Sequence, residues 1–294
     1  MNLYIIGNGF DLAHGLSTSF SSFRNFMEQQ SKDSVDRWAK IISIKLDENW
    51  NNLEESFQYV DYDYINDLCS SFIHNYNEEK WSDSYHHDYQ YEISKYLDLI
   101  LNSDNYLRKW LNSIYNRCSR KFELEENSIY LTFNYTNVLE DVYCIEKNNI
   151  CHIHGDMSSN DKLILGHANS NILLEMENII YDDDVRIIEG KQIFNNSKQF
   201  SYKNSENLIN ENISFFKTCK NVKRIYIIGH SVEAICNVDF EYYKKIASLV
   251  NKDEVVINVV LYNKADIEEY KYILNSFGFA NINFLTYDDI EHDF

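Results

Sequence analysis

Short hydrophobic runs alternate with amphipathic stretches along much of the chain. The runs are short, continuous and partly β-branched, which predicts buried strands. They cover residues 2–6, 129–133, 150–153, 163–165, 224–228, 254–262 and 282–285. Between several of them hydrophobic residues recur at helical spacing, as from Asp239 to Val250. Strands that alternate with helices predict an α/β fold, with a Rossmann-like, mostly parallel sheet covered by helices on both faces.

A second pattern fills the stretch after the first strand. From about Ser17 to Phe122 the hydrophobic residues fall mainly at helical spacing, and Ser103 with Asp104 is a candidate N-cap. About 105 residues are too many for one crossover helix, so the pattern predicts a large helical insertion after the first strand. The predicted domains are a Rossmann-like nucleotide-binding domain, residues 1–16 and 126–294, and the helical insertion, residues 17–125.

The glycines mark the ends of predicted strands. The chain has 8 glycines and no proline. Six of the glycines lie in four short motifs, each just after a hydrophobic run: Gly7, Gly9 and Gly15, then Gly155, Gly166 and Gly229. Glycine lets a backbone turn sharply or approach a ligand closely, and parallel sheets bind ligands at the carboxyl ends of their strands. The pattern therefore predicts a nucleotide-type pocket at that edge of the sheet.

The first motif departs from the generic dinucleotide fingerprint, because Leu12 occupies the position of its third glycine. Its turn can still place a phosphate on the amides that open the next helix, with Asn8 and Asp11 at the mouth. The alternative for Asp11 is that it only caps a helix starting near Leu12. In the motif after the fifth predicted strand, Gly229 and His230 precede Ser231, which can cap the following segment while its amide binds phosphate.

Two further motifs offer polar side chains. Asn134 directly follows a strand, and its amide suits a ribose hydroxyl or an ordered water; the alternative is a cap for a helix over 138–143. His152 and His154 occupy alternate positions before Gly155, which predicts a neutral histidine base at a strand end. A metal site with Cys151 or Asp156 is the alternative; because no third ligand is specified, we expect no metal.

Composition narrows the classes of partner. The net charge of −19 disfavours nucleic acid, whose phosphates would be repelled. No apolar run approaches the roughly 20 residues of a membrane helix, and no secretory peptide is visible at the start. The six cysteines show no C-x-x-C spacing, which favours reduced thiols. We expect a cytoplasmic protein that does not bind membranes.

Taken in order, the motifs resemble the AbiH family of bacteriophage abortive-infection proteins. The residues that carry the resemblance are Gly7-Asn8-Gly9-Phe10-Asp11 with Gly15-Leu16, Trp50 with Leu53-Glu54-Glu55, Phe133-Asn134-Tyr135-Thr136, His152-Ile153-His154-Gly155, and Ile228-Gly229-His230-Ser231 with Asp239. The resemblance implies a role in phage defence. It does not specify a reaction.

A more distant likeness to sirtuins implies chemistry. The spacing of Gly7, Gly9 and Gly15 is similar to their first NAD-binding motif, and Asn134 and His154 match the residues beside the nicotinamide ribose. The cysteine-bound zinc module of sirtuins is absent, and Thr136 stands where they have an aspartate. Sirtuin-like defence effectors that destroy NAD also lack that module, so the likeness implies NAD hydrolysis rather than protein deacetylation.

We therefore expect NAD, as substrate or ligand, with Asn134 and His154 as catalytic residues. The residues expected to hold the nucleotide are Gly7, Asn8, Gly9, Asp11, Gly15, Gly155, Gly229, His230 and Ser231. The alternative is a non-catalytic nucleotide-sensing or adaptor protein of a defence system. A third alternative is a hydrolase or nuclease that acts on another phosphate ester. A homo-oligomer or a partner protein of the defence system is also compatible with the sequence.

Overall fold

The computed structural model describes residues 1–48, 50–77, 82–116, 118–125, 127–174, 184–262 and 264–290. Residue contacts divide the chain into two compact units. The sheet unit consists of Met1–Ser19, Arg108–Ile164 and Asn204–Phe294, and the helical unit of Phe20–Leu107 and Leu165–Lys203. The domain boundaries drawn from the sequence stay a prediction.

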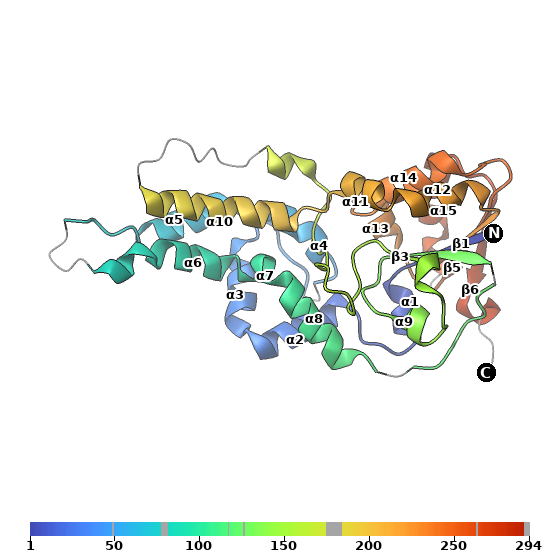
Figure 1. Ribbon diagram of the computed structural model, residues 1–294, viewed down its shortest axis with the longest axis horizontal. Helices are drawn as coiled ribbons and strands as arrows, with labels where there is room; N and C mark the ends of the chain where they lie inside the picture. Colours follow the sequence, from blue (N-terminus) through green and yellow to red (C-terminus); the bar gives the residue numbers. More distant parts are fainter. Residues whose placement is uncertain are drawn as a thin grey trace. The chain divides into compact units, whose positions relative to one another are not determined.

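A single six-stranded sheet forms the centre of the sheet unit (Figure 1). Its strands are β1 (Asn2–Ile6), β2 (Ser128–Thr132), β3 (Ile150–His152), β4 (Arg224–Ile228), β5 (Val256–Leu261) and β6 (Ile282–Thr286). Every neighbouring pair is parallel, in the order β3-β2-β1-β4-β5-β6. This arrangement confirms the predicted α/β fold with a Rossmann-like parallel sheet. The strand order reverses between β1 and β4, which is the switch point where such sheets bind ligands.

One strand expected from the sequence is wrong. Residues 163–165 form no strand, although they are hydrophobic and mostly buried. The amide of Ile164 donates a single bond to the carbonyl of His154, and no neighbouring strand pairs with this segment among the described residues. Hydrophobic burial alone produced the strand-like pattern here, because the segment packs inside without joining a ladder.

The two faces of the sheet bury different sets of residues. Leu3, Ile5 and Leu131 belong to a core shared with the helices that follow the strands, whereas Tyr4 and Ile6 belong to a second core with α1 and α9. This alternation follows from the two-residue period of a strand. The helices of the sheet unit are α1 (Asn8–Ala13), α9 (Val138–Asp141), α11 (Ser205–Glu211), α12 (Ile213–Thr218), α13 (Val232–Cys236), α14 (Phe240–Leu249) and α15 (Ile267–Ser276).

The helical unit is built from short helices. They are α2 (Phe20–Gln30), α3 (Lys32–Ile41), α4 (Leu53–Ser56), α5 (Tyr62–Ser70), α6 (Asp88–Tyr96), α7 (Asp98–Leu101) and α10 (Val185–Ser201), while α8 (Ser103–Ile114) crosses the boundary between the units. The 3₁₀ turns are Phe57–Tyr59, Asp83–His86, Lys147–Asn149, Ser170–Leu173, Cys219–Asn221, Lys264–Asp266 and Tyr287–Asp289. Helix α10 packs along α6 (Figure 1), and a Cβ on Gly190 would overlap the Tyr89 ring. Glycine at this position therefore permits the close helix contact.

A buried ion pair joins distant segments within the helical unit. The Nζ of Lys203 lies 2.7 Å from Oε1 of Glu54, and the lysine side chain is 0% exposed. The backbone amide of Lys203 donates to the carbonyl of His167, whose own amide donates to the carbonyl of Ser201. Burial and the nearby lysine charge lower the pKa of His167 to about 4, so this histidine is neutral at pH 7. His167 therefore adds no charge beside Lys203, and Glu54 provides the opposite charge.

Replacing Glu54 by glutamine keeps the shape of the side chain and removes its charge. Because the ammonium of Lys203 would remain buried without a carboxylate, we expect a loss of about 3 to 5 kcal/mol in the free energy of unfolding. The matched control is Glu241→Gln, whose ion pair with Lys244 lies at the surface and should change stability by less than about 1 kcal/mol. Urea denaturation of both variants measures the difference; equal effects would refute the structural role of the buried pair.

Candidate functional site

The turns that follow β1 and β4 lie directly against each other. The amide of Gly7 donates to the carbonyl of Ile228 at 2.9 Å, and the amide of Gly9 donates to that of Gly229 at 2.8 Å. A Cβ on Gly7 would lie 2.5 Å from the Cα of His230, and one on Gly9 would lie 2.6 Å from the Cα of Gly229. The glycines of the two motifs are therefore required by backbone packing at the switch point.

This packing decides which groups remain for a ligand. The Gly7 and Gly9 amides already have acceptors, while Asn8 and Ser231 are exposed, one on each turn. The Ser231 hydroxyl accepts a hydrogen bond from the amide of Ala234 at 3.3 Å and caps α13, as the sequence predicted. Asn8 and Ser231 are the polar side chains that the two turns present to solvent.

The remaining glycines of the expected site have conformational roles. Gly15 has φ of +80°, and a Cβ added there would meet no atom within 4 Å, so only its backbone conformation favours glycine. Gly155 follows β3 with φ of +86°. Its turn directs the chain after His154 back along residues 162–164, where the Ile164 amide reaches the carbonyl of His154.

Asp11 is a buried carboxyl group inside α1. It is 1% exposed and accepts hydrogen bonds from Nδ2 of Asn134 at 2.9 Å and from Oγ1 of Thr136 at 2.7 Å. Burial raises the pKa of Asp11 to about 6, against the two hydrogen bonds, which lower it. Because the helix begins at Asn8, the alternative in which Asp11 caps a helix near Leu12 is wrong.

Asn134 connects the ends of β1 and β2. Its Nδ2 also donates to the carbonyl of Gly7 at 3.1 Å, so both amide hydrogens are used. The helix α9 begins after Asn137, and Asn134 does not cap it. The acceptor Oδ1 of Asn134 has no hydrogen-bond partner in the described part of the chain. This oxygen is the group that Asn134 can offer to a ligand or a water.

The two histidines of the third motif have different partners. His152 contacts the carbonyl of Asn134 at 3.1 Å through Nδ1, and Oε1 of Glu140 at 3.0 Å through Nε2. Burial would raise the pKa of Glu140, but the hydrogen bond and charge of His152 outweigh it and lower that pKa. His154 instead lies near Asp239, with 3.6 Å between its Nε2 and the carboxylate Oδ1. The imidazole rings of His152 and His154 therefore face different carboxylates and are not placed to bind one metal ion together.

A second cluster surrounds His154. His230 lies 3.0 Å from Oδ2 of Asp239 through Nε2, and the ring of Phe133 stacks on His230 with 4.2 Å between centroids. Phe133 also contacts His154, at 5.4 Å between centroids. The structure thus brings together residues that follow β2, β3 and β4. Asp239, at the start of α14, is the residue whose role the sequence did not reveal, although it lies nine positions after His230.

The expected catalytic residues, Asn134 and His154, belong to different clusters. Asn134 belongs to the Asp11 cluster, whereas the neighbouring residue Phe133 belongs to the His154 cluster. No hydrogen bond joins Asn134 and His154 among the described residues. A ligand or a water that involves both side chains has to reach from one cluster to the other.

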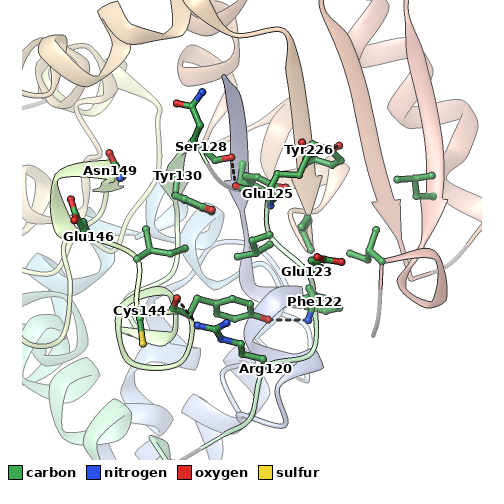
Figure 2. Close-up of a pocket in the computed structure, with 18 of the residues that line it drawn as sticks. Arg120, Phe122, Glu123, Glu125, Ser128, Tyr130, Cys144, Glu146, Asn149 and Tyr226 are labelled. Carbon is green, nitrogen blue, oxygen red and sulfur yellow. Dashed lines mark hydrogen bonds between the residues drawn. The ribbon is translucent and has the colours of Figure 1, made fainter. Parts of the chain in front are cut away.

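A separate pocket opens on the face of the sheet that carries Tyr4, Tyr130 and Tyr226, with a volume of about 1090 Å³ (Figure 2). The Tyr4 ring stacks between the other two, at centroid distances of 5.2 and 4.8 Å. Glu125 accepts a hydrogen bond from the Tyr226 hydroxyl at 2.6 Å, and Arg120 donates to main-chain carbonyls. None of the residues expected to bind a nucleotide lines this pocket.

In the parts of the chain that the structure describes, no group of three or more histidine, cysteine, aspartate or glutamate residues is placed to hold a metal ion. Across the same residues, no helix has the length and apolar character needed to span a membrane.

Comparison with known proteins places the chain in a family. The family model described as bacteriophage abortive infection AbiH matches residues 3–261, which includes both clusters and the two glycine turns. The chain belongs to the AbiH family. Membership indicates a role in phage abortive infection. Neither the curated proteins nor the solved structures gave a significant match.

The glycine turns of this AbiH protein predict an order of stability effects. Gly15→Ala strains only the backbone and should cost about 1 to 2 kcal/mol. Gly7→Ala should cost more, because a methyl group there overlaps the backbone of His230, which no side-chain rotation can relieve. Urea denaturation of the two variants measures the order, and a smaller loss for Gly7→Ala would contradict the packing role.

The raised pKa of Asp11 predicts a dependence of stability on pH. The folded-state pKa of Asp11, about 6, lies above the ordinary 3.8. The contribution of this group to the free energy of unfolding is therefore present at low pH and is lost as pH rises through about 6. An asparagine at this position can accept from Asn134 and donate to Thr136 without ionising. The stability of Asp11→Asn relative to wild type should therefore increase by about 1.4 kcal/mol from pH 5 to pH 8. Denaturant titrations of both proteins across this pH range measure the difference in the free energy of unfolding. A difference that stays constant with pH would contradict the raised pKa of Asp11.

Proposed function

We propose that this AbiH protein is a phage-defence effector that hydrolyses NAD at the bond between nicotinamide and ribose. The observation that supports the proposal is the position of the motif residues at the switch point of the sheet. The glycine turns follow β1 and β4, Asn134 follows β2, and His154 follows β3. Open α/β sheets bind dinucleotides outside the carboxyl ends of their strands at this point.

Asn134 would act through its side-chain oxygen. Asp11 and the Gly7 carbonyl hold the amide nitrogen, so the orientation of the side chain is fixed. Oδ1 can then accept a hydrogen bond from a ribose hydroxyl or from the attacking water. The Thr136 hydroxyl, which donates to the same carboxyl group, keeps Asp11 in place. Asp11 would lie near the nicotinamide end of the substrate.

His154 would serve as the general base. When the glycosidic bond breaks, its electron pair leaves with nicotinamide and the ribose gains oxocarbenium character. Water forms the new bond to the anomeric carbon, and His154 takes the proton that the water loses. The products are nicotinamide and ADP-ribose, and no other reactant is needed.

The nucleotide end would meet the two glycine turns. Asn8 and Ser231 are the exposed polar residues there, and Gly7, Gly9 and Gly229 set the shape of the surface. Gly15 and Gly155 would contribute through the backbone conformations they allow. The ring nitrogens of His230 face Asp239 and Tyr243, so His230 would contribute through its backbone.

The test is release of nicotinamide from NAD by the purified protein. We expect His154→Ala to reduce turnover by roughly 10²- to 10⁴-fold, because it removes the base. Asn134→Ala should also reduce turnover, and thermal melting must show that each variant is folded. His152→Ala is the matched comparison, because this histidine lies two residues away and has a different partner, Glu140.

Each outcome leads to a distinct conclusion. Release by wild type but not by His154→Ala supports the proposal. Loss in His152→Ala with full activity in His154→Ala would assign the base to the other ring. NAD binding without nicotinamide release would favour a non-catalytic sensor or adaptor. Absence of both binding and release, including in cells infected with phage, would refute the proposal.

A further inference from the structure

Asp239 lies between two buried histidines. Its Oδ2 is 3.0 Å from Nε2 of His230, and its Oδ1 is 3.6 Å from Nε2 of His154. The three side chains are at most 5% exposed. A buried carboxylate needs hydrogen bonds or opposite charge around it. The two imidazole rings follow β3 and β4 and lie where they can donate hydrogen bonds to the carboxylate of Asp239.

The position of the proton on His230 follows from its two neighbours, Asp239 and Tyr243. The Tyr243 hydroxyl lies 2.7 Å from Nδ1 of His230. Burial, with the nearby Tyr270 and Asp239, raises the pKa of Tyr243 well above its ordinary value, so the phenol keeps its proton. A carboxylate can only accept hydrogen bonds, so Nε2 of His230, which lies 3.0 Å from Oδ2 of Asp239, carries the ring proton and donates it. On a neutral ring Nδ1 then accepts a hydrogen bond from the Tyr243 hydroxyl.

His154 also lies with its Nε2 near the carboxylate, at a longer distance than His230. Its Nε2 faces both Oδ1 of Asp239 and the Tyr242 hydroxyl, at 3.6 and 3.5 Å. The Phe133 ring packs against both imidazoles, nearly perpendicular to that of His154 and stacked on that of His230. Hydrogen bonds in catalytic sites are often long before substrate binds, and the 3.6 Å separation is compatible with one that shortens.

We propose that Asp239 is a positioning residue that holds His154 and His230 through its two carboxylate oxygens. The part concerning catalysis rests on the proposed function, in which His154 is the base. With its proton on Nε2 and directed at Asp239, His154 has Nδ1 as its basic nitrogen. Asp239 therefore determines which nitrogen of His154 receives the proton from water. A carboxylate that fixes the tautomer and orientation of a catalytic histidine acts in this way in other hydrolases.

The chemistry of the carboxylate gives a test that does not depend on activity. A carboxylate accepts hydrogen bonds from both rings, whereas the amide of asparagine offers one acceptor and one donor. In Asp239→Asn, at least one of the two rings must change its tautomer or lose its partner. The matched control is Glu140→Gln, because Glu140 pairs with the third histidine of this region, His152.

The measurement is long-range ¹H–¹⁵N NMR of protein labelled at histidine, with signals assigned from single histidine variants. In wild type we expect a proton on Nε2 of both His154 and His230. A ring without that proton in the wild-type protein would overturn the proposal, whether or not Asp239→Asn folds. Asp239→Asn should change the ring signals of His154 or His230 and leave His152 unchanged. Glu140→Gln should do the reverse.

Unchanged His154 and His230 signals in folded Asp239→Asn would also overturn the proposal. For nicotinamide release we expect Asp239→Asn to lower kcat at least about tenfold while KM stays within about twofold, because orientation of the base matters only in the reaction step. If folded Asp239→Asn instead showed an unchanged kcat and a KM raised about tenfold, the result would contradict the positioning role of Asp239. If wild type releases no nicotinamide, the proposed function fails, whereas the NMR result still decides whether Asp239 holds both rings.

Discussion

The contact between the β1 turn and the β4 turn is the constraint on which the candidate site depends. Gly7 and Gly9 donate to carbonyls at the end of β4, at distances possible only without side chains at these positions. The carbonyl of Gly7 in turn holds Asn134, which holds Asp11. On the other side of the contact, His230 follows Gly229 and reaches Asp239. Both clusters are thus anchored to one backbone junction.

Buried carboxyl groups in this region are accommodated in two ways. Asp11 accepts its hydrogen bonds from the uncharged side chains of Asn134 and Thr136, and burial raises its pKa. Glu140 lies beside His152, which lowers the pKa of Glu140 in spite of burial. Phe133 and Asn134 are adjacent in the chain and belong to the His154 cluster and the Asp11 cluster respectively, so the segment after β2 connects the two clusters. A ligand that contacts both clusters would meet the carboxyl group of Asp11 on one side and the histidine pair on the other.

Local sequence patterns were sufficient for the architecture. Continuous hydrophobic runs and alternating helices predicted the parallel sheet, and glycines after the runs predicted where its polar edge lies. The pattern failed at residues 163–165, because hydrophobicity reports burial and cannot show whether a neighbouring strand is available. The association of α10 with α6 was also not visible, since the two helices are far apart in sequence and their contact depends on Gly190 lying against Tyr89.

The sequence by itself determined the residue types of the site and their order: two glycine turns, an asparagine and two histidines after successive strands. Only the tertiary structure decided how they are grouped. It separated His152 from His154 and placed Asp239, nine residues beyond His230, between two rings. It also showed that the Gly7 and Gly9 amides bond to the chain itself. Spacing along a strand fixes the side to which a residue points, whereas the partner it meets there depends on segments brought together by folding.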